Sequence, residues 1–412
     1  MKVLTVVLNL EKGGTQRAAQ NFCESYQQLG HDSRILSMAK GGPRAAELKA
    51  ANIVVWETLE AAQADLRIWQ PEVVHLHSHG LRAHEVRELR GMTPGARFIE
   101  TNVFCRPTES EPELLSSFQL STWCLFLYRC RGGDPGKGVI VPNPVKCDTM
   151  YRSSAAEIAA FKQHYGIPAD RFVIGRVGQA LWRKWSPSLV DIFRKFSAAV
   201  APNSHLLLCN PPEGLVAMLQ ADPALTGRVT IVPSLIGDDP LRRFYSALDV
   251  MVHISDTGES FGMVIPECLL CETPVLTLNT PWSDNAQGEI VGNGIGGLAV
   301  NTLDGLFAGL VGLHGDPGTR VQMGRKGRAH VLSSFEMRAV AARALEVLAQ
   351  RADARFRLAS LFPYMDDTLV GRILIALMYV TRSDRAMIWA RQYFLRRSGL
   401  SPEIQAAIPG ML

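Results

Sequence analysis

The stretch Glu259-Ser260-Phe261-Gly262-Met263-Val264-Ile265-Pro266-Glu267 joins a predicted strand to a predicted helix and carries a carboxylate at each end. The apolar run 250–254 is predicted to be the strand, and residues 261–270 the helix. Backbone N–H groups around Phe261 and Gly262 would then lie at the helix start, where they suit a phosphate or a sugar hydroxyl. Glu259 from the loop and Glu267 from the helix would accept hydrogen bonds from ligand hydroxyls. The stretch therefore predicts a ligand with both hydroxyls and phosphates, such as a nucleotide sugar.

Strand-to-helix connections of this kind repeat outward along the chain. Short apolar runs alternate with helical patterns, which is typical of βαβ units in a parallel sheet covered on both faces. In the first series we predict strands at residues 3–8, 33–37, 73–76, 98–101 and 139–141, and helices at 15–29, 59–69 and 83–89. In the second we predict strands at 172–177, 205–209, 229–232, 250–254 and 274–278, and helices at 155–165, 187–199, 241–248, 261–270 and 317–332. The fold class is therefore α/β, with two domains.

The domain boundary is predicted at Pro142-Asn143-Pro144, because prolines so close together suit neither a helix nor a central strand. The length of 412 residues is compatible with two or three domains. We predict an N-terminal domain at 1–150, a C-terminal domain at 151–350 and a purely helical extension at 351–412.

Composition and charge narrow the function classes. The chain is 47% hydrophobic, which excludes a generally disordered protein. It has 43 Lys and Arg against 39 Asp and Glu, so it lacks the excess of basic residues that is typical of proteins that bind nucleic acids. The apolar run 3–8 is too short for a secretory signal, and no run is long enough to span a membrane. We expect a soluble, cytoplasmic chain. The arginines of 351–412 and its apolar run 373–380 allow a peripheral contact with anionic lipid, or a helical pair packed on the N-terminal domain.

The potential metal ligands are scattered. The eight cysteines form no disulfide framework, and the pair Cys268 and Cys271 is interpreted as buried core, because no second pair lies at zinc-like spacing. His75, His77 and His79 alternate at the end of a predicted strand, where a metal site, a substrate-cleft role and ordinary polar packing are all open. No carboxylate or cysteine pattern joins them, so we predict no bound metal.

A glycine pair, Gly13-Gly14, lies between the first predicted strand and the helix that opens at Thr15. Glycines there let an anionic ligand approach the backbone at the positive end of the helix. The spacing is not the GxGxxG of a dinucleotide site, and an ordinary tight turn is the alternative.

In their order and spacing these motifs resemble retaining glycosyltransferases of the GT-B fold, specifically glycosyltransferase family 4, over residues 1–350. Glu259 to Glu267 resembles the Glu-x7-Glu motif of that family, and Gly13-Gly14-Thr15-Gln16-Arg17 resembles its opening glycine loop. Further matching segments are Leu29-Gly30-His31, Val74-His75-Leu76-His77, Val141-Pro142-Asn143-Pro144-Val145, Glu272-Thr273-Pro274-Val275, Gly288-Glu289-Ile290-Val291 and Gly296-Gly297-Leu298.

The resemblance implies roles for individual residues. Glu259 would lie near the transferred sugar and the diphosphate, Glu267 would bind the ribose hydroxyls, and Lys184 would neutralise the diphosphate leaving group. The expected catalytic residues are Glu259, Lys184 and His77. The expected donor-binding residues are Gly13, Gly14, Arg183, Phe261, Gly262 and Glu267.

Three positions depart from the family pattern. Gln179 stands where the family has an arginine, for which Arg183 or Arg176 could substitute. Asn102 is the nearest candidate for a histidine that the family often has after the fourth strand of its N-terminal domain. Asn210-Pro211-Pro212 lies where a glycine-rich turn is common.

The resemblance implies two Rossmann-like, doubly wound domains facing a central cleft. The C-terminal one would hold the nucleotide sugar, and the other a glycan, lipid-linked or small-molecule acceptor. The expected reaction is a metal-independent, retaining hexosyl transfer to an acceptor hydroxyl, without a cofactor, in the synthesis of surface polysaccharide or another glycan. A nucleotide-sugar epimerase and a non-catalytic GT-B scaffold are the alternatives.

Overall fold

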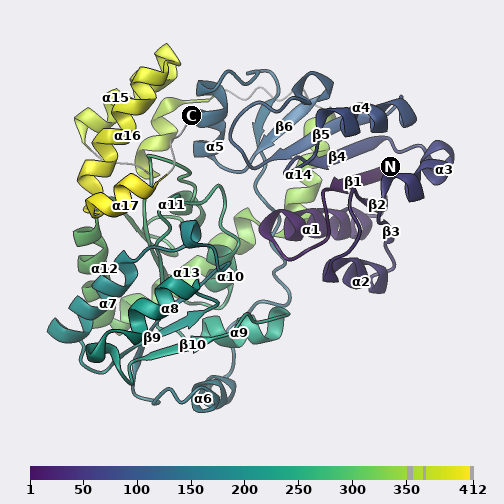
Figure 1. Cartoon of the computed structure of the whole chain (residues 1–412). Helices are drawn as coiled ribbons and strands as arrows, with labels where there is room; N and C mark the ends of the chain where they lie inside the picture. Colours follow the sequence, from purple (N-terminus) through teal and green to yellow (C-terminus); the bar gives the residue numbers. More distant parts are fainter. Residues whose placement is uncertain (350–355, 365–367, 409–412) are drawn as a thin grey trace. The chain divides into compact units, whose positions relative to one another are not determined.

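The computed structural model describes residues 1–349, 356–364 and 368–408, which form two compact units (Figure 1). Within those described residues, the first unit comprises Met1–Lys146 and Phe335–Ser360, and the second comprises Cys147–Ser334 and Leu361–Leu412. Each unit is built around one parallel sheet with helices on it, which confirms the predicted α/β class.

The first unit has a seven-stranded sheet in the order β3-β2-β1-β4-β5-β6-β7, in which all neighbouring strands are parallel. The strands are β1 (Lys2–Val7), β2 (Asp32–Ser37), β3 (Val54–Trp56), β4 (Val73–His77), β5 (Arg97–Asn102), β6 (Ser116–Gln119) and β7 (Gly138–Ile140). The helices are α1 (Gly14–Gln28), α2 (Pro43–Ala50), α3 (Leu59–Trp69), α4 (Ala83–Met92), α5 (Thr122–Cys130) and α14 (Met337–Ala349), with the 3-10 turn η1 (Glu111–Glu113). The strand order reverses between β1 and β4, as in doubly wound, Rossmann-like sheets.

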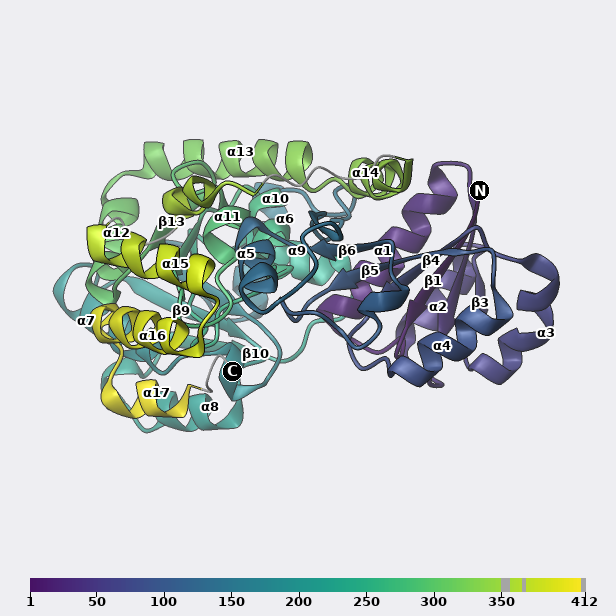
Figure 2. The same cartoon turned by 90° about the horizontal axis from the view of Figure 1, so that it is seen from above.

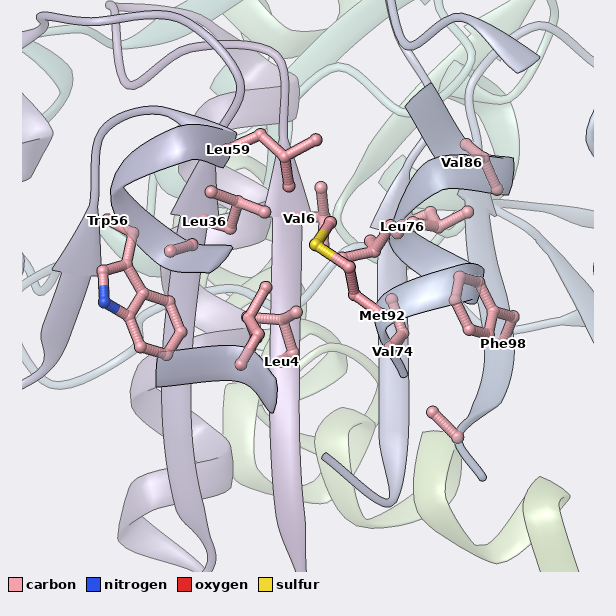
Figure 3. Packing of buried hydrophobic residues seen from close by; sticks show 14 of the residues in the cluster. Leu4, Val6, Leu36, Trp56, Leu59, Val74, Leu76, Val86, Met92 and Phe98 are labelled. Atoms are coloured by element: carbon pink, nitrogen blue, oxygen red, sulfur yellow. The ribbon is translucent and has the colours of Figure 1, made fainter. Parts of the chain in front are cut away.

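The two faces of this sheet enter two different hydrophobic cores, because successive side chains of a strand point to opposite faces. Figure 3 shows one core, in which Leu4 and Val6 of β1 lie beside neighbouring strand residues and beneath α3 and α4. On the other face Val3 packs with Phe22 and Tyr26 of α1. The apolar runs that predict the strands are thus the residues that fill the space between the layers.

Helix α14 corrects one part of the predicted domain organisation. We predicted that residues up to 350 belong to the C-terminal domain, but α14 lies in the first unit. Its buried residues Val340, Ala341 and Ala344 join the core that holds Phe22 of α1. A backbone bridge also ties Val145 to the segment before α14, since the Val145 N–H donates to the Phe335 carbonyl at 2.8 Å. The chain therefore returns to the first unit after completing the second.

The second unit has a six-stranded parallel sheet in the order β10-β9-β8-β11-β12-β13. The strands are β8 (Phe172–Val177), β9 (Ser204–Cys209), β10 (Val229–Val232), β11 (Val250–His253), β12 (Val275–Leu278) and β13 (Gly297–Val300). The helices are α6 (Ala155–His164), α7 (Ser188–Ala199), α8 (Glu213–Gln220), α9 (Asp238–Ser246), α10 (Val264–Leu270), α11 (Gln287–Val291), α12 (Leu303–Gly315) and α13 (Pro317–Ser334), with the 3-10 turns η2 (Trp182–Lys184) and η3 (Pro223–Leu225). Cys268 and Cys271 are fully buried in this unit, which confirms that they are core residues.

The C-terminal region is helical where the structure describes it, with the 3-10 segment η4 (Leu358–Tyr364) and the helices α15 (Leu369–Thr381), α16 (Asp384–Ser398) and α17 (Pro402–Ala407). These helices belong to the second unit, so the alternative that they pack on the N-terminal domain is wrong. Gly399, which ends α16 at φ +79°, lies against α12, where a Cβ would be 3.6 Å from Leu303 Cβ. Parts of the predicted extension, residues 351–355, 365–367 and 409–412, lie outside the described residues. No described helix is both long and apolar enough to cross a bilayer.

Candidate active site

The second sheet reverses its strand order between β8 and β11, and the predicted site residues Lys184 and Glu259 lie in the loops that leave these two strands. The strands are direct neighbours, with Val250 opposite Ile174 and Met251 opposite Gly175. Their carboxyl ends therefore emerge at one edge of the sheet, where open parallel sheets bind ligands. The loop after β8 carries Lys184 in η2, and the loop after β11 carries Glu259.

Lys184 and Glu259 form a close ion pair at this edge. Lys184 Nζ lies 2.6 Å from Glu259 Oε2, and the side chains keep 27% and 12% of their surface exposed. The other carboxylate oxygen, Oε1, lies 3.6 Å from Nε2 of His253, the buried last residue of β11. His253 is a site neighbour that the sequence patterns did not single out, although its position at a strand end beside the two-glutamate stretch was visible.

The charges of this cluster are set by burial and by each other. Burial by itself would raise the pKa of Glu259, but the Lys184 charge and the contacts of Lys184 and His253 outweigh it and hold that pKa well below its usual range. Burial and the neighbouring Arg176 lower the pKa of His253 to about 4, although Glu259 opposes that shift. At neutral pH the cluster therefore holds an ionised Glu259 carboxylate and a neutral His253 imidazole.

Arg176 does not replace the arginine that the family has at position 179. Its side chain is buried, and its guanidinium donates to the carbonyls of Val177 and Lys184, the latter at 2.8 Å. The guanidinium also lies 5.1 Å from the ring centroid of Trp185, whose Nε1 donates to the Gln179 carbonyl at 2.8 Å. Arg176 and Trp185 thus hold the loop that carries Lys184, and these internal contacts favour Arg183 over Arg176 as the substitute for the missing arginine.

Arg183 is placed differently. Its backbone carbonyl accepts hydrogen bonds from Ser255 Oγ and Thr257 Oγ1, which fastens the two loops together. The side chain is exposed, and among the described residues its guanidinium has no hydrogen-bond or ion-pair partner. Of the two candidates for a second cation, only Arg183 can reach a ligand without breaking internal contacts.

The helix after Glu259 begins later than predicted. Residues 261–270 were expected to be helical, but α10 starts at Val264. Gly262 has a φ of +77°, a left-handed conformation that breaks the helix and that side chains rarely adopt. A Cβ there would lie 3.0 Å from Glu259 Cγ, so the glycine also leaves room for that side chain. Phe261 is buried before the helix, and its ring is part of the core rather than of an open surface.

Glu267 lies within α10 and is 5% exposed. Its Oε2 accepts a hydrogen bond from the Tyr245 hydroxyl at 3.1 Å, which orients the carboxylate. Asp256, in the loop before Glu259, was also missed. It is buried, burial raises its pKa to about 6, and its Oδ1 has no hydrogen-bond partner among the described residues. A buried acceptor without a partner is a candidate contact for a ligand hydroxyl.

The remaining predicted residues lie in the first unit. Gly13 is the N-cap of α1 and Gly14 its first residue. A Cβ at Gly13 would lie 2.2 Å from Gln16 Oε1, and Nε2 of the same Gln16 side chain donates a hydrogen bond to Asn9 Oδ1 at 3.0 Å. The glycine loop therefore reaches the helix N-terminus as predicted from the chain pattern.

The three histidines do not converge. His75 is bonded on both ring nitrogens, to the Tyr26 hydroxyl at 2.9 Å and Thr101 Oγ1 at 2.8 Å, and is core. His77 is fully buried beside it, and burial lowers its pKa to about 3. His79 stacks on Phe104. In the described part of the chain no group of three His, Cys, Asp or Glu side chains is arranged to hold a metal ion.

A buried carboxylate, Glu100, organises the neighbouring strand ends of this unit. Its Oε2 accepts from Ser78 Oγ at 2.6 Å and its Oε1 from Ser117 Oγ at 2.5 Å, with further bonds from Thr108 and Asn102. The Asn102 amide also donates to the Arg106 carbonyl at 2.7 Å. Asn102, the nearest candidate for the missing family histidine, is therefore engaged in holding its own loop.

The family model that matches this chain lies within the second unit. Residues 157–329, which include Lys184, Glu259 and Glu267, match the family model described as Glycosyl transferases group 1. The chain is similar to the D-inositol 3-phosphate glycosyltransferase of Kineococcus radiotolerans, with 30% identity over 52% of each chain. It is also similar to the enzyme of that name from Salinispora tropica, with 28% identity over 35% of this chain and 33% of the relative. The matches thus span about a third to a half of the length of these curated relatives.

Among solved structures, the fold is similar to that of HepE from Anabaena in complex with UDP and glucose, with a TM-score of 0.69 and 16% identity over 85% of this chain and 100% of the other. At this identity the likeness establishes the fold alone. Together with the two parallel sheets and the helical C-terminal region, it confirms the predicted GT-B fold.

Proposed function

We propose that the chain is a retaining glycosyltransferase of family 4 that moves a hexosyl group from a nucleotide sugar to an acceptor hydroxyl. The observation that carries this proposal is the ion pair of Lys184 and Glu259 at the strand-order reversal of the second sheet. A cation held at a ligand-binding edge suits a diphosphate, and a carboxylate beside it suits the hydroxyls of a sugar.

Lys184 stabilises the departing nucleoside diphosphate. Its ammonium has three donors, and the contact with Glu259 leaves others for phosphate oxygens. Because negative charge on the diphosphate grows as the bond to the sugar breaks, a fixed cation there stabilises the transition state more than the bound donor. Arg183, exposed on the same turn, supplies the second positive charge that Gln179 cannot.

Glu259 orients the sugar and holds Lys184 in place. Glu267, positioned by Tyr245, accepts hydrogen bonds from the ribose hydroxyls. The backbone at Phe261 and Gly262 faces the sugar diphosphate. No covalent glycosyl intermediate is assigned, and the leaving phosphate takes the acceptor proton. The proposed reaction uses no bound metal and no cofactor.

The acceptor is proposed to be a glycan, a lipid-linked sugar or a small molecule, bound by the first unit. The product is proposed to serve the synthesis of surface polysaccharide or another glycan in the cytoplasm. The similarity to proteins named D-inositol 3-phosphate glycosyltransferase supports including phosphorylated polyols in an acceptor screen. The solved relative with UDP and glucose supports starting the donor screen with uridine nucleotides.

The first experiment is a thermal-shift screen of nucleoside diphosphates and their sugars. A donor present at about 100 times its Kd should stabilise the protein by about 2.7 kcal/mol. The stabilising donor is then incubated alone and with acceptors, and the products are identified by mass spectrometry and by the anomeric signals in NMR.

A glycoside of unchanged anomeric configuration supports the proposal. Inversion of that configuration contradicts the retaining mechanism, and conversion of the donor to an isomer without acceptor supports an epimerase. Donor binding without turnover on any acceptor supports a non-catalytic scaffold, a reading that the neutral Gln179 favours.

A further inference from the structure

Helix α15 presents an apolar stripe that the fold does not cover. Leu369, Ile373, Leu377 and Val380 follow one another at helical spacing on one face, with Val370 at its margin. Leu369 is 72% exposed and Val380 is 77% exposed, and the three others are also exposed. No charged residue interrupts this face. Exposed apolar residues gathered in a row, rather than scattered singly, mark a surface that binds something.

This stripe is distinct from the packing face of the helix. The buried residues of α15 are Gly371, Ile375 and Met378. Helices α15 and α16 lie side by side in both views (Figures 1 and 2). The neighbouring α16 exposes two more large apolar side chains, Ile388 and Trp389, of which Trp389 is 59% exposed. Both helices of the pair therefore expose large apolar side chains.

The charge of the same region is strongly positive. Residues 368–408 contain six arginines and no lysine, against the two carboxylates Asp384 and Glu403. Three of these arginines have internal contacts, namely Arg372 over Phe362, Arg391 with the Ile408 carbonyl, and Arg397 with the Tyr393 hydroxyl. Arg382, Arg385 and Arg396 are exposed. Arg382 ends α15, and the other two lie on α16 with Trp389.

We propose that α15 and α16 form a docking surface for an anionic lipid bilayer. Apolar side chains flanked by arginines, with an exposed tryptophan, suit the boundary between headgroups and acyl chains, where the apolar residues insert and the arginines attract anionic headgroups. A helix of 13 residues lies in this boundary and does not span the bilayer. A second copy of the chain fits less well, because it would bring like-charged arginine clusters together. This surface is independent of the proposed catalytic activity.

The test is sedimentation of the full chain with vesicles. One set contains phosphatidylglycerol in phosphatidylcholine, and the other contains phosphatidylcholine alone. The apolar variant replaces Leu369, Ile373 and Val380 by Gln, and the charge variant replaces Arg385 and Arg396 by Gln. The matched control is Arg67→Gln with Ile68→Gln on α3, where Ile68 is 84% exposed. Circular dichroism and the melting temperature show whether each variant is folded.

We expect the wild-type chain and the control to sediment with the anionic vesicles and much less with the neutral ones. At roughly 1 kcal/mol for each arginine near an anionic surface, the charge variant should bind about 25-fold more weakly. The apolar variant should lose most binding at every vesicle composition. High salt should weaken wild-type binding, because it screens the headgroup charge.

Equal sedimentation of folded wild-type and variant chains, or no sedimentation of the wild type, would overturn the proposal. So would a concentration-dependent dimer in light scattering that the apolar variant abolishes while vesicle binding is absent. Vesicle binding needs neither donor nor acceptor. Its failure would therefore not contradict the proposed glycosyl transfer, and a failure of glycosyl transfer would not contradict the proposed vesicle binding.

Discussion

Each unit holds a buried glutamate at the carboxyl ends of its parallel strands, and the two glutamates are satisfied in opposite ways. Glu100 in the first unit accepts hydrogen bonds from the neutral groups of Ser78, Ser117, Thr108 and Asn102. Glu259 in the second unit is paired with the charged Lys184. The neutral donors belong to nearby strands and loops, which hold them against the Glu100 carboxylate. A lysine ammonium is a point charge on a flexible side chain, so it can contact a bound ligand as well as Glu259.

The same contrast shows in the pKa values. Burial raises the pKa of Glu100 although four hydrogen bonds oppose it. For Glu259 the lysine outweighs burial and lowers the pKa. The Glu100 carboxylate, bound by neutral groups, stabilises the loops around it. The Glu259 carboxylate, bound by a cation, leaves two opposite charges at the edge of the sheet where a ligand can bind. We therefore assign the chemistry to the second unit and a structural role to Glu100.

The largest expected effect follows from removing the cation. Lys184→Met should lower kcat by roughly 100-fold to 1,000-fold and raise the donor KM much less, because the charge it meets grows in the transition state. Steady-state kinetics with the donor found by the screen measures both constants. Lys326→Met, an exposed lysine on α13, is the matched control and should have wild-type kinetics.

The same assay tests Arg183. Arg183→Met should weaken the donor more modestly, since the side chain is exposed and its contact with phosphate would be screened by solvent. A larger loss of kcat in Arg183→Met than in Lys184→Met would reverse the assignment of the two cations. Wild-type turnover in both variants would show that this loop does not meet the diphosphate.

The next effect concerns donor affinity. Glu267→Gln keeps the shape of the side chain and removes its charge, so the Kd for the nucleotide should rise by roughly tenfold or more, as expected when charge-assisted hydrogen bonds are weakened. Isothermal titration calorimetry measures the Kd. Tyr245→Phe removes the hydroxyl that orients Glu267 and should have a smaller effect in the same direction. A lower melting temperature with unchanged nucleotide affinity would instead indicate a structural carboxylate.

A smaller effect distinguishes the two glutamates by pH. The folded-state pKa of Glu259 lies below that of the unfolded chain, so its ionisation stabilises the fold above about pH 4.3 and this contribution is lost as the pH falls. The folded-state pKa of Glu100 is raised, so its contribution is present below about pH 4.3 and is lost as the pH rises through the folded-state value.

Urea unfolding of wild type, Glu259→Gln and Glu100→Gln between about pH 3 and pH 7 tests this. The difference in unfolding free energy between wild type and Glu259→Gln should grow with pH up to about pH 4.3 and then level off, whereas the difference for Glu100→Gln should be level up to about pH 4.3 and shrink above it. Parallel pH profiles for the two variants would remove the distinction between the two sites.

Metal chelation is expected to have no effect on activity. Activity should survive EDTA, because the proposed mechanism places Lys184 and Arg183 where a metal-dependent enzyme would hold a divalent cation on the diphosphate. Turnover is measured before and after chelation, and again after single divalent ions are added back. Loss on chelation that one ion restores would contradict the metal-independent mechanism.

Much of the fold was accessible from local patterns. The strands at 172–177 and 229–232 have the predicted bounds, because each is a short, mostly apolar segment flanked by polar and turn residues. Strands β3, β6 and β13 were missed. Strand β3 is only Val54–Trp56, β6 (Ser116–Gln119) is mostly polar, and β13 (Gly297–Val300) is a four-residue strand that begins with glycine. The start of α10 was misplaced because Gly262 adopts a left-handed conformation, which interrupts the helical pattern that the sequence shows from Phe261.

The candidate site was predictable as a set of residues but not as a set of contacts. Glu259 and Lys184 could be named from their motifs, yet their 2.6 Å contact joins positions 75 residues apart. Arg176 and Arg183 looked equally available in the sequence. Only their surroundings separate them, because Arg176 is enclosed by Trp185 and backbone carbonyls whereas Arg183 is exposed.

By itself the sequence determined the α/β alternation, the two sheets, the glycine loop at α1 and the glutamate stretch at the edge of the second sheet, because periodicity and turn residues act over a few neighbours. The tertiary structure alone decided that α14 returns to the first unit, that His77 is buried, that His253 lies beside Glu259, and that α15 leaves an apolar stripe uncovered. Burial and charge pairing depend on which distant segments pack together, and no local pattern encodes that choice.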